Sequence, residues 1–121
     1  MKEVLDDSLG NSNVLSHRSL NQRTIREVVY GIGIGVHSGE KVRITLRPAL
    51  VNSGIQFIRT DIKGAVAIPA RAENVADTTL ATSIAHGSIS VATVEHLMSA
   101  LWGLGIDNLI VELSAEEVPI M

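Results

Sequence analysis

Hydrophobic and polar residues alternate along several short stretches of the chain, a pattern that predicts strands with one buried face. The clearest example is "KVRITLRPA" at 41–49, where Val42, Ile44 and Leu46 alternate with charged and hydroxyl residues. The stretch "DNLIVELS" at 107–114 predicts a second strand from the same alternation. Further extended segments are predicted at 55–62, 65–75 and 78–91, the last as two short strands around a loop at 86–87.

Glycine alternates with isoleucine in "GIGIG" at 31–35, within a β-like stretch that runs from Thr24 to Val36. The two-residue period places both isoleucines on one face of a strand and bare backbone on the other. A phosphate-binding loop is excluded, because these glycines lead into a turn and another strand instead of opening a helix. The pattern therefore predicts a strand whose glycine face is closely approached by other backbone.

One segment has the period of a helix. Over 93–104, four aliphatic side chains fall on one helix face: Val94, Leu97, Met98 and Leu101. Thr93 is predicted to cap the N-terminus of this helix, and glycines follow its last turn. Many strands and one late helix together predict an α+β fold in which a β-sheet packs against the helix.

Composition narrows the class of protein. The chain has 121 residues, of which 45% are apolar, which suffices for a single, mainly aliphatic core. A net charge of −3 leaves no basic field, so nucleic acid is excluded as a partner. With no cysteine there is neither a disulfide nor a thiolate metal site. No stretch has the length of a transmembrane segment or the core of a secretory signal, so we expect a soluble, cytoplasmic protein with a flexible leader at 1–21.

An acid and an imidazole, Glu95 and His96, are adjacent at the start of the predicted helix. Neither lies on its aliphatic face, so neither is expected in the core. The helix dipole favours a carboxylate there and disfavours a charged imidazole, whereas a neutral imidazole can bind a metal. A catalytic zinc site needs three protein ligands, and no second ligand stands at helical spacing. From the residues alone, a dipole-matched Glu95 beside a chance His96 is the simpler interpretation.

The other three histidines stand in turns or polar loops. His37 follows the glycine strand in "VHSGE", where the small glycines leave room beside it. A solvated turn residue and a residue facing a site both remain open for His37. His17 and His86 are expected to have no chemical role.

Several motifs occur in an order that resembles one family. They are "QRTI" at 22–25, "GIGIGVHSGEKVRITLRPA" at 31–49, "RTD" at 59–61, "ENVADTTLATSI" at 73–84, "SVATVEHLMSALWGLGIDN" at 90–108 and "EEVPIM" at 116–121. This series resembles the N-terminal part of the UDP-3-O-acyl-N-acetylglucosamine deacetylases, zinc amidohydrolases of lipid A biosynthesis in Gram-negative bacteria. The resemblance implies that residues 22–121 form the first domain of a two-domain α/β sandwich, cut before its second helix, in an enzyme that is monomeric when intact.

The resemblance also implies roles for individual residues. Glu95 would be the general base that activates the attacking water, and His96 would be one of three Zn²⁺ ligands. His37 and the pair Thr79 and Leu80 would contact the substrate, UDP-3-O-acyl-N-acetylglucosamine. The other two zinc ligands and the general acid of such enzymes lie in a segment that this sequence does not contain. We therefore expect this chain to be inactive by itself.

Two alternatives to a catalytic role stay open: a non-catalytic substrate-binding module, and a structural stub or gene fragment. The absent second helix bears on stability in either case. Without it, the aliphatic residues of the strand at 109–113 are expected to be exposed, which would make the fragment marginally stable and prone to aggregate.

Overall fold

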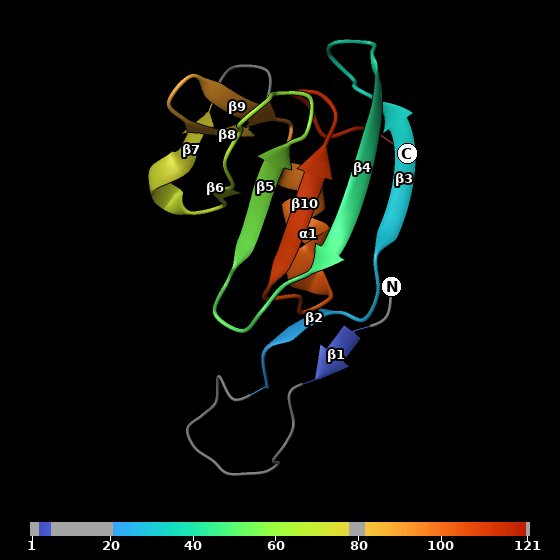
Figure 1. The fold of residues 1–121 in the computed structure, drawn as a ribbon, viewed down its shortest axis with the longest axis vertical. Coiled ribbons are helices and arrows are strands. Elements are labelled where there is room, and N and C mark those ends of the chain that lie inside the picture. Colours follow the sequence, from blue (N-terminus) through green and yellow to red (C-terminus); the bar gives the residue numbers. More distant parts are fainter. Residues whose placement is uncertain (1–2, 6–20, 78–81, 121) are drawn as a thin grey trace.

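The computed structural model describes residues 3–5, 21–77 and 82–120 of the chain. Thr79 and Leu80, implied to contact the substrate, lie outside these ranges, as does His17. The chain forms a five-stranded sheet, and Figure 1 shows helix α1 (Glu95–Gly103) against it. The predicted α+β class is confirmed. No helix within the described ranges is long and apolar enough to cross a membrane.

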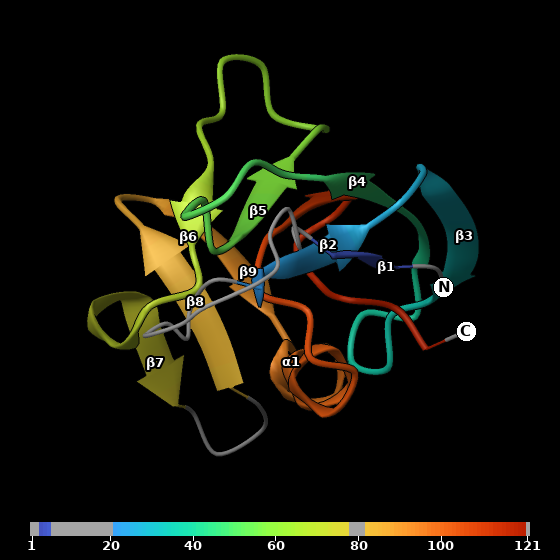
Figure 2. The same ribbon diagram turned by 90° about the horizontal axis from the view of Figure 1, so that it is seen from below.

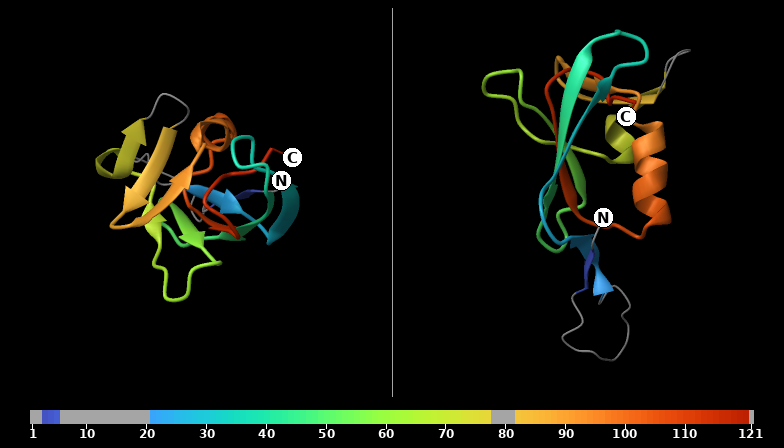
Figure 3. Two further views of the ribbon diagram at one scale, coloured as in Figure 1. Left: turned by 90° about the horizontal axis from the view of Figure 1, so that it is seen from above. Right: turned by 90° about the vertical axis from the view of Figure 1, so that its right-hand side faces the viewer.

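The larger sheet has the strand order β3-β4-β10-β5-β6. Its strands are β3 (Val29–Ile34), β4 (Lys41–Pro48), β10 (Leu109–Leu113), β5 (Ile55–Arg59) and β6 (Ile68–Pro69). The central strand β10 runs antiparallel to β4 and parallel to β5, with Val111 opposite Leu46 on one side and Phe57 on the other. Helix α1 covers one face of this sheet, as the right-hand view of Figure 3 shows.

The core follows the predicted alternation. Val42, Ile44 and Leu46 of β4 are buried, and the three aliphatic residues at alternate positions of β10 have no exposed surface. The expectation that 109–113 would be exposed is therefore wrong. The reason is topological: β10 is hydrogen-bonded on both edges and lies under α1, so its inner face is covered without a second helix.

The glycine strand is confirmed as a site of close backbone approach. Gly33 faces the C-terminal segment, and a Cβ at this position would overlap the carbonyl group of Ile120. Ile34 and Ile120 exchange two backbone hydrogen bonds, of 3.0 and 2.8 Å, beside this contact. The isoleucines point outward instead, since the side chain of Ile32 is 58% exposed. The glycine face is thus the face turned toward the body of the protein.

The β-like stretch from 24 to 36 is divided in the structure. Its first part belongs to β2 (Arg23–Ile25), which pairs antiparallel with β1 (Glu3–Leu5), and a bend separates it from β3. The strand β1 falls inside the segment predicted as a leader. Three residues are too few to show a period of two, which is why the pattern gave no sign of this pairing.

A smaller sheet of three antiparallel strands stands beside the helix. It consists of β7 (Val75–Asp77), β8 (Thr82–His86) and β9 (Ile89–Ala92). The predicted pair of short strands around 86–87 is confirmed, with Gly87 in the left-handed region at φ 64°. Of the strand predicted over 65–75, only β6 and the first residue of β7 are extended, and a short 3₁₀ helix, η2 (Ala72–Asn74), lies between them.

The "RTD" motif connects the two sheets. The guanidinium group of Arg59, at the end of β5, donates to both carboxylate oxygens of Asp61 at 2.9 and 2.7 Å. A third N–H of Arg59 donates to the carbonyl oxygen of Ser90 in β9 at 3.1 Å. The motif thus joins β5 of the larger sheet to β9 of the smaller sheet.

Candidate active site

The acid–imidazole pair lies at the first turn of α1, where the helix emerges beside the smaller sheet (Figure 2). Glu95 is half-buried and His96 is exposed, so both are outside the core, as predicted. The predicted cap is wrong. Val94 is the N-cap and makes no side-chain cap, whereas Thr93 has a left-handed backbone with φ 62°. Its hydroxyl group donates instead to a carboxylate oxygen of Glu117, and no side-chain hydrogen bond caps α1.

Glu95 faces the smaller sheet. Its carboxylate oxygen Oε1 accepts a hydrogen bond from the backbone N–H of Thr82, at 3.3 Å. Together with Ile84 and Trp102, these residues line a cavity of about 490 Å³ between α1 and strand β8. The contact with Thr82 orients the carboxylate toward the beginning of β8.

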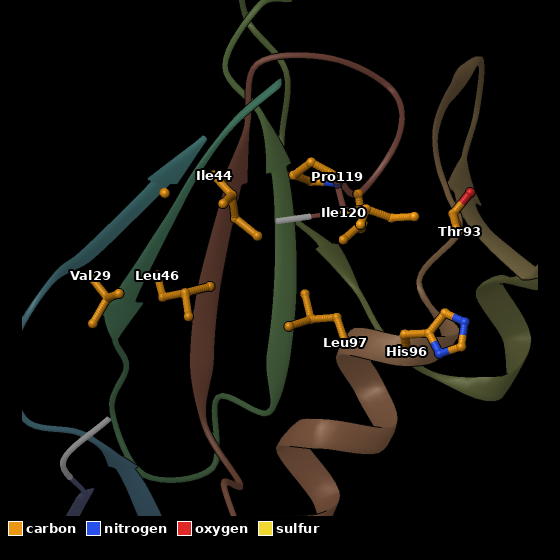
Figure 4. A pocket seen from close by; sticks show the side chains of 10 residues that line it. Val29, Ile44, Leu46, Thr93, His96, Leu97, Pro119 and Ile120 are labelled. Carbon is orange, nitrogen blue, oxygen red and sulfur yellow. The ribbon is translucent and has the colours of Figure 1, made fainter. Parts of the chain in front are cut away.

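His96 lines a different cavity, of about 440 Å³, between α1 and strands β3 and β4 (Figure 4). The walls of this cavity are almost wholly apolar: Val29, Ile44, Leu46, Leu97, Val118, Pro119 and Ile120 contribute to it. Successive residues of a helix point about 100° apart, which is why Glu95 and His96 face two cavities. The first turn of α1 therefore separates the two spaces, with the acid on one side and the imidazole on the other.

His37 lies in the turn between β3 and β4, and its side chain is exposed. The turn is closed by the backbone N–H of Gly39, which donates to the carbonyl oxygen of Gly35 at 2.8 Å. The backbone N–H groups of His37 and Ser38 donate to the two carboxylate oxygens of Glu117, at 2.9 and 3.0 Å. His86, by contrast, is exposed at the end of β8 and lines neither cavity.

Glu117 is the residue that sequence reasoning missed. It is only 2% exposed, and it accepts a further hydrogen bond from the hydroxyl group of Thr93, at 3.1 Å. Burial alone would raise the pKa of Glu117, but the donors from His37, Ser38 and Thr93 outweigh it and hold the pKa below its ordinary value. One signal was available: an acid directly before the apolar run Val118–Ile120, opposite glycines predicted to receive a close neighbour.

The stabilisation that Glu117 provides is expected to fade in acid. In the folded chain the pKa of Glu117 lies below its ordinary value of 4.5. The stabilisation from its carboxylate is therefore complete above pH 4.5 and is lost as the pH falls through the pKa of the folded state. The free-energy difference between the native chain and Glu117→Gln should therefore be largest near neutral pH and shrink in acid. Urea unfolding of both chains at about pH 7 and about pH 3 measures it. A difference that stays constant with pH would contradict the assignment.

The fit to a metal can be tested on the residues themselves. Within the described ranges no three histidine, aspartate or glutamate side chains are close enough together to hold a metal ion. The imidazole of His96 has no hydrogen-bond partner among the described residues and borders a cavity, so its ring nitrogens are available to a ligand. These residues thus fit one position of a zinc site, and the remaining ligands have to come from outside the described part.

The first helical turn of this α+β fold thus places a carboxylate and an available imidazole beside two cavities. Residues 22–121 match the family model described as LpxC, UDP-3-O-acyl N-acetylglycosamine deacetylase. The chain therefore belongs to the UDP-3-O-acyl-N-acetylglucosamine deacetylase family, a family of hydrolases.

Proteins named UDP-3-O-acyl-N-acetylglucosamine deacetylase are similar over 102 residues. The chain is 58% identical to the protein of Teredinibacter turnerae, 60% to that of Chromohalobacter salexigens and 57% to that of Hahella chejuensis. Each match covers 84% of this chain and 34% of the relative. The chain thus spans about a third of the length of the curated relatives it matches, in agreement with the N-terminal part that the motifs indicated.

Proposed function

We propose that this chain supplies the N-terminal part of a zinc-dependent deacetylase that removes acetate from UDP-3-O-acyl-N-acetylglucosamine. The observation that carries the proposal is the position of Glu95 and His96 on one helical turn, within a segment nearly 60% identical to named deacetylases. On this proposal the enzyme works in the cytoplasm of Gram-negative bacteria, in lipid A biosynthesis. Its substrate is a nucleotide sugar. The cavities beside Glu95 and His96 are mainly apolar, so they would not bind this substrate through charged groups.

The chemistry assigns a separate task to each residue. His96 is one of three ligands of Zn²⁺, which when bound supplies the Lewis acid that makes amide hydrolysis possible near neutral pH. Glu95 takes a proton from water at a carboxylate oxygen, while the water oxygen bonds to the acetamide carbonyl carbon. The carbon–nitrogen bond then breaks, acetate leaves, and the sugar nitrogen takes up a proton from an acid outside this chain. The hydrogen bond from Thr82 orients the carboxylate for the first of these transfers.

Substrate contacts are assigned on the matched motifs. His37 stands in a turn whose backbone is tied to the segment that leads into α1, which supports a place for it near Glu95 and His96. Thr79 and Leu80 belong to the motif directly before β8, the strand whose first residue contacts Glu95. These three residues are proposed to contact the nucleotide sugar.

A chimera tests the proposal, because this chain alone supplies only one of the proposed zinc ligands, His96. Residues 22–121 replace the matching segment of the Chromohalobacter salexigens deacetylase, and acetate release and zinc content are measured. The chimera should release acetate, and His96→Ala should lose both its zinc and its activity. The isolated 121-residue chain should bind no zinc tightly.

Each outcome decides between functions. A chimera that folds and binds substrate but releases no acetate would overturn the catalytic proposal and favour a binding module. A chimera that folds but shows neither binding nor turnover would favour a structural stub. A His96→Ala chimera with full zinc content would remove His96 from the ligand set.

A further inference from the structure

A buried carboxylate joins two parts of the molecule that the proposed function needs together. Glu117 follows β10 in the sequence. Its side chain lies between the turn that carries His37 and the start of α1. Its oxygen Oε2 accepts from both the His37 N–H and the Thr93 hydroxyl, at 2.9 and 3.1 Å. A single atom therefore links the turn to the residue three positions before His96.

The neighbouring backbone is shaped to admit this carboxylate. A Cβ on Gly35 would overlap Oε1 of Glu117 and the hydroxyl oxygen of Ser38. Glycine at 35 thus leaves the space that the carboxylate occupies, while the turn after it supplies two N–H donors. Among the described residues Glu117 has no ion-pair partner, so its charge is satisfied by these dipoles alone.

The backbone of Thr93 gives a second sign of constraint. A β-branched residue with φ 62° is strained, and such conformations persist only where the surroundings enforce them. Here the hydroxyl group of Thr93 donates to Glu117, and the next residue, Val94, is tied by its N–H to the carbonyl oxygen of Thr82. The direction in which α1 leaves the smaller sheet is fixed at this point.

We propose that Glu117 is a positioning residue, which holds the turn that carries His37 against the start of α1, where the first helical turn carries Glu95 and His96. This inference rests on the proposed function. Packing alone does not call for a charged group here, since an uncharged side chain of the same size would fill the space between Gly35 and Thr93. The carboxylate is required because it accepts from donors on two separate elements at once.

A double-mutant cycle in the chimera tests the coupling. Glu117→Gln keeps the size of the side chain but loses its charge, and should lower kcat/KM about tenfold through charge-assisted hydrogen bonds. If Glu117 acts through His37, then the double variant Glu117→Gln/His37→Ala should be no slower than the worse single variant. If the two losses in kcat/KM added up in the double variant, the proposal would be overturned. Additive losses are expected when Glu117→Gln only lowers stability and does not act through His37.

The matched control is Glu116→Gln, at the exposed neighbouring residue, which should leave kcat/KM unchanged. A direct readout uses the chimera labelled with ¹⁵N-histidine and ¹⁵N-serine. The amide protons of His37 and Ser38 should move upfield in Glu117→Gln and stay in place in Glu116→Gln. Unchanged amide signals in Glu117→Gln would overturn the proposal. If the unsubstituted chimera released no acetate, the proposed function would fail, and the amide signals alone would decide the role of Glu117.

Discussion

The chimera carrying Glu95→Gln is expected to release acetate about 10²–10⁴-fold more slowly than the unsubstituted chimera, with its zinc content unchanged. Glutamine preserves the size of the side chain and an oxygen that can accept from the N–H of Thr82. It cannot accept a proton from water, so only the proton transfer is lost. Acetate release and metal content measured on the same preparation separate this effect from loss of the metal, which belongs to His96→Ala.

The control for Glu95 is Glu73→Gln. Glu73 is an exposed acid in η2 that lines neither cavity, so this variant should keep the parent rate. If the Glu95→Gln chimera released acetate within about threefold of the parent rate, Glu95 would be excluded as the general base, because removal of a general base lowers the rate far more. A variant that lost its zinc as well would show instead that Glu95 supports the metal site.

Replacing Gly33 with alanine is expected to lower the free energy of unfolding of the chain by about 2 kcal/mol. The added methyl group would overlap the carbonyl group of Ile120 and touch Pro119. Backbone atoms cannot move aside as a side chain can, so the C-terminal segment would have to leave β3. Urea unfolding followed by circular dichroism measures the change.

Gly103→Ala is the matched control for this substitution. Gly103 closes α1, and a Cβ there meets no atom within 4 Å. Alanine is the better helix former, so this variant should be as stable as the native chain or slightly more stable. A Gly33→Ala chain as stable as Gly103→Ala would show that the contact between β3 and Ile120 contributes little.

Patterns within a single element were predictable from the sequence. The alternation in β4 placed Val42, Ile44 and Leu46 in the core, and the "GIGIG" period predicted a face approached by backbone. The helix was predicted over 93–104 and observed over 95–103. Such patterns follow from local geometry, which one stretch of chain carries by itself.

Properties that depend on distant segments were not predictable. Thr93 is a good helix cap by type, but its hydroxyl group is bound by Glu117, 24 residues further on. The exposure expected for 109–113 was wrong because no local pattern tells that this strand lies between β4 and β5. For the candidate site, the adjacency of Glu95 and His96 was visible in the sequence, whereas their separation into two cavities and the role of Glu117 appeared only in three dimensions.

The central place of β10 also decides when the sheet can form. β4 and β5 lie on either side of it and pair with each other nowhere, so during synthesis both present open edges until residues 109–113 emerge. Pairing β10 with β4 then requires contacts across more than sixty positions of sequence, the kind that slows folding. The nascent chain is therefore most exposed to edge-to-edge aggregation just before β10 emerges, and a chaperone that shields β4 and β5 would act in that interval.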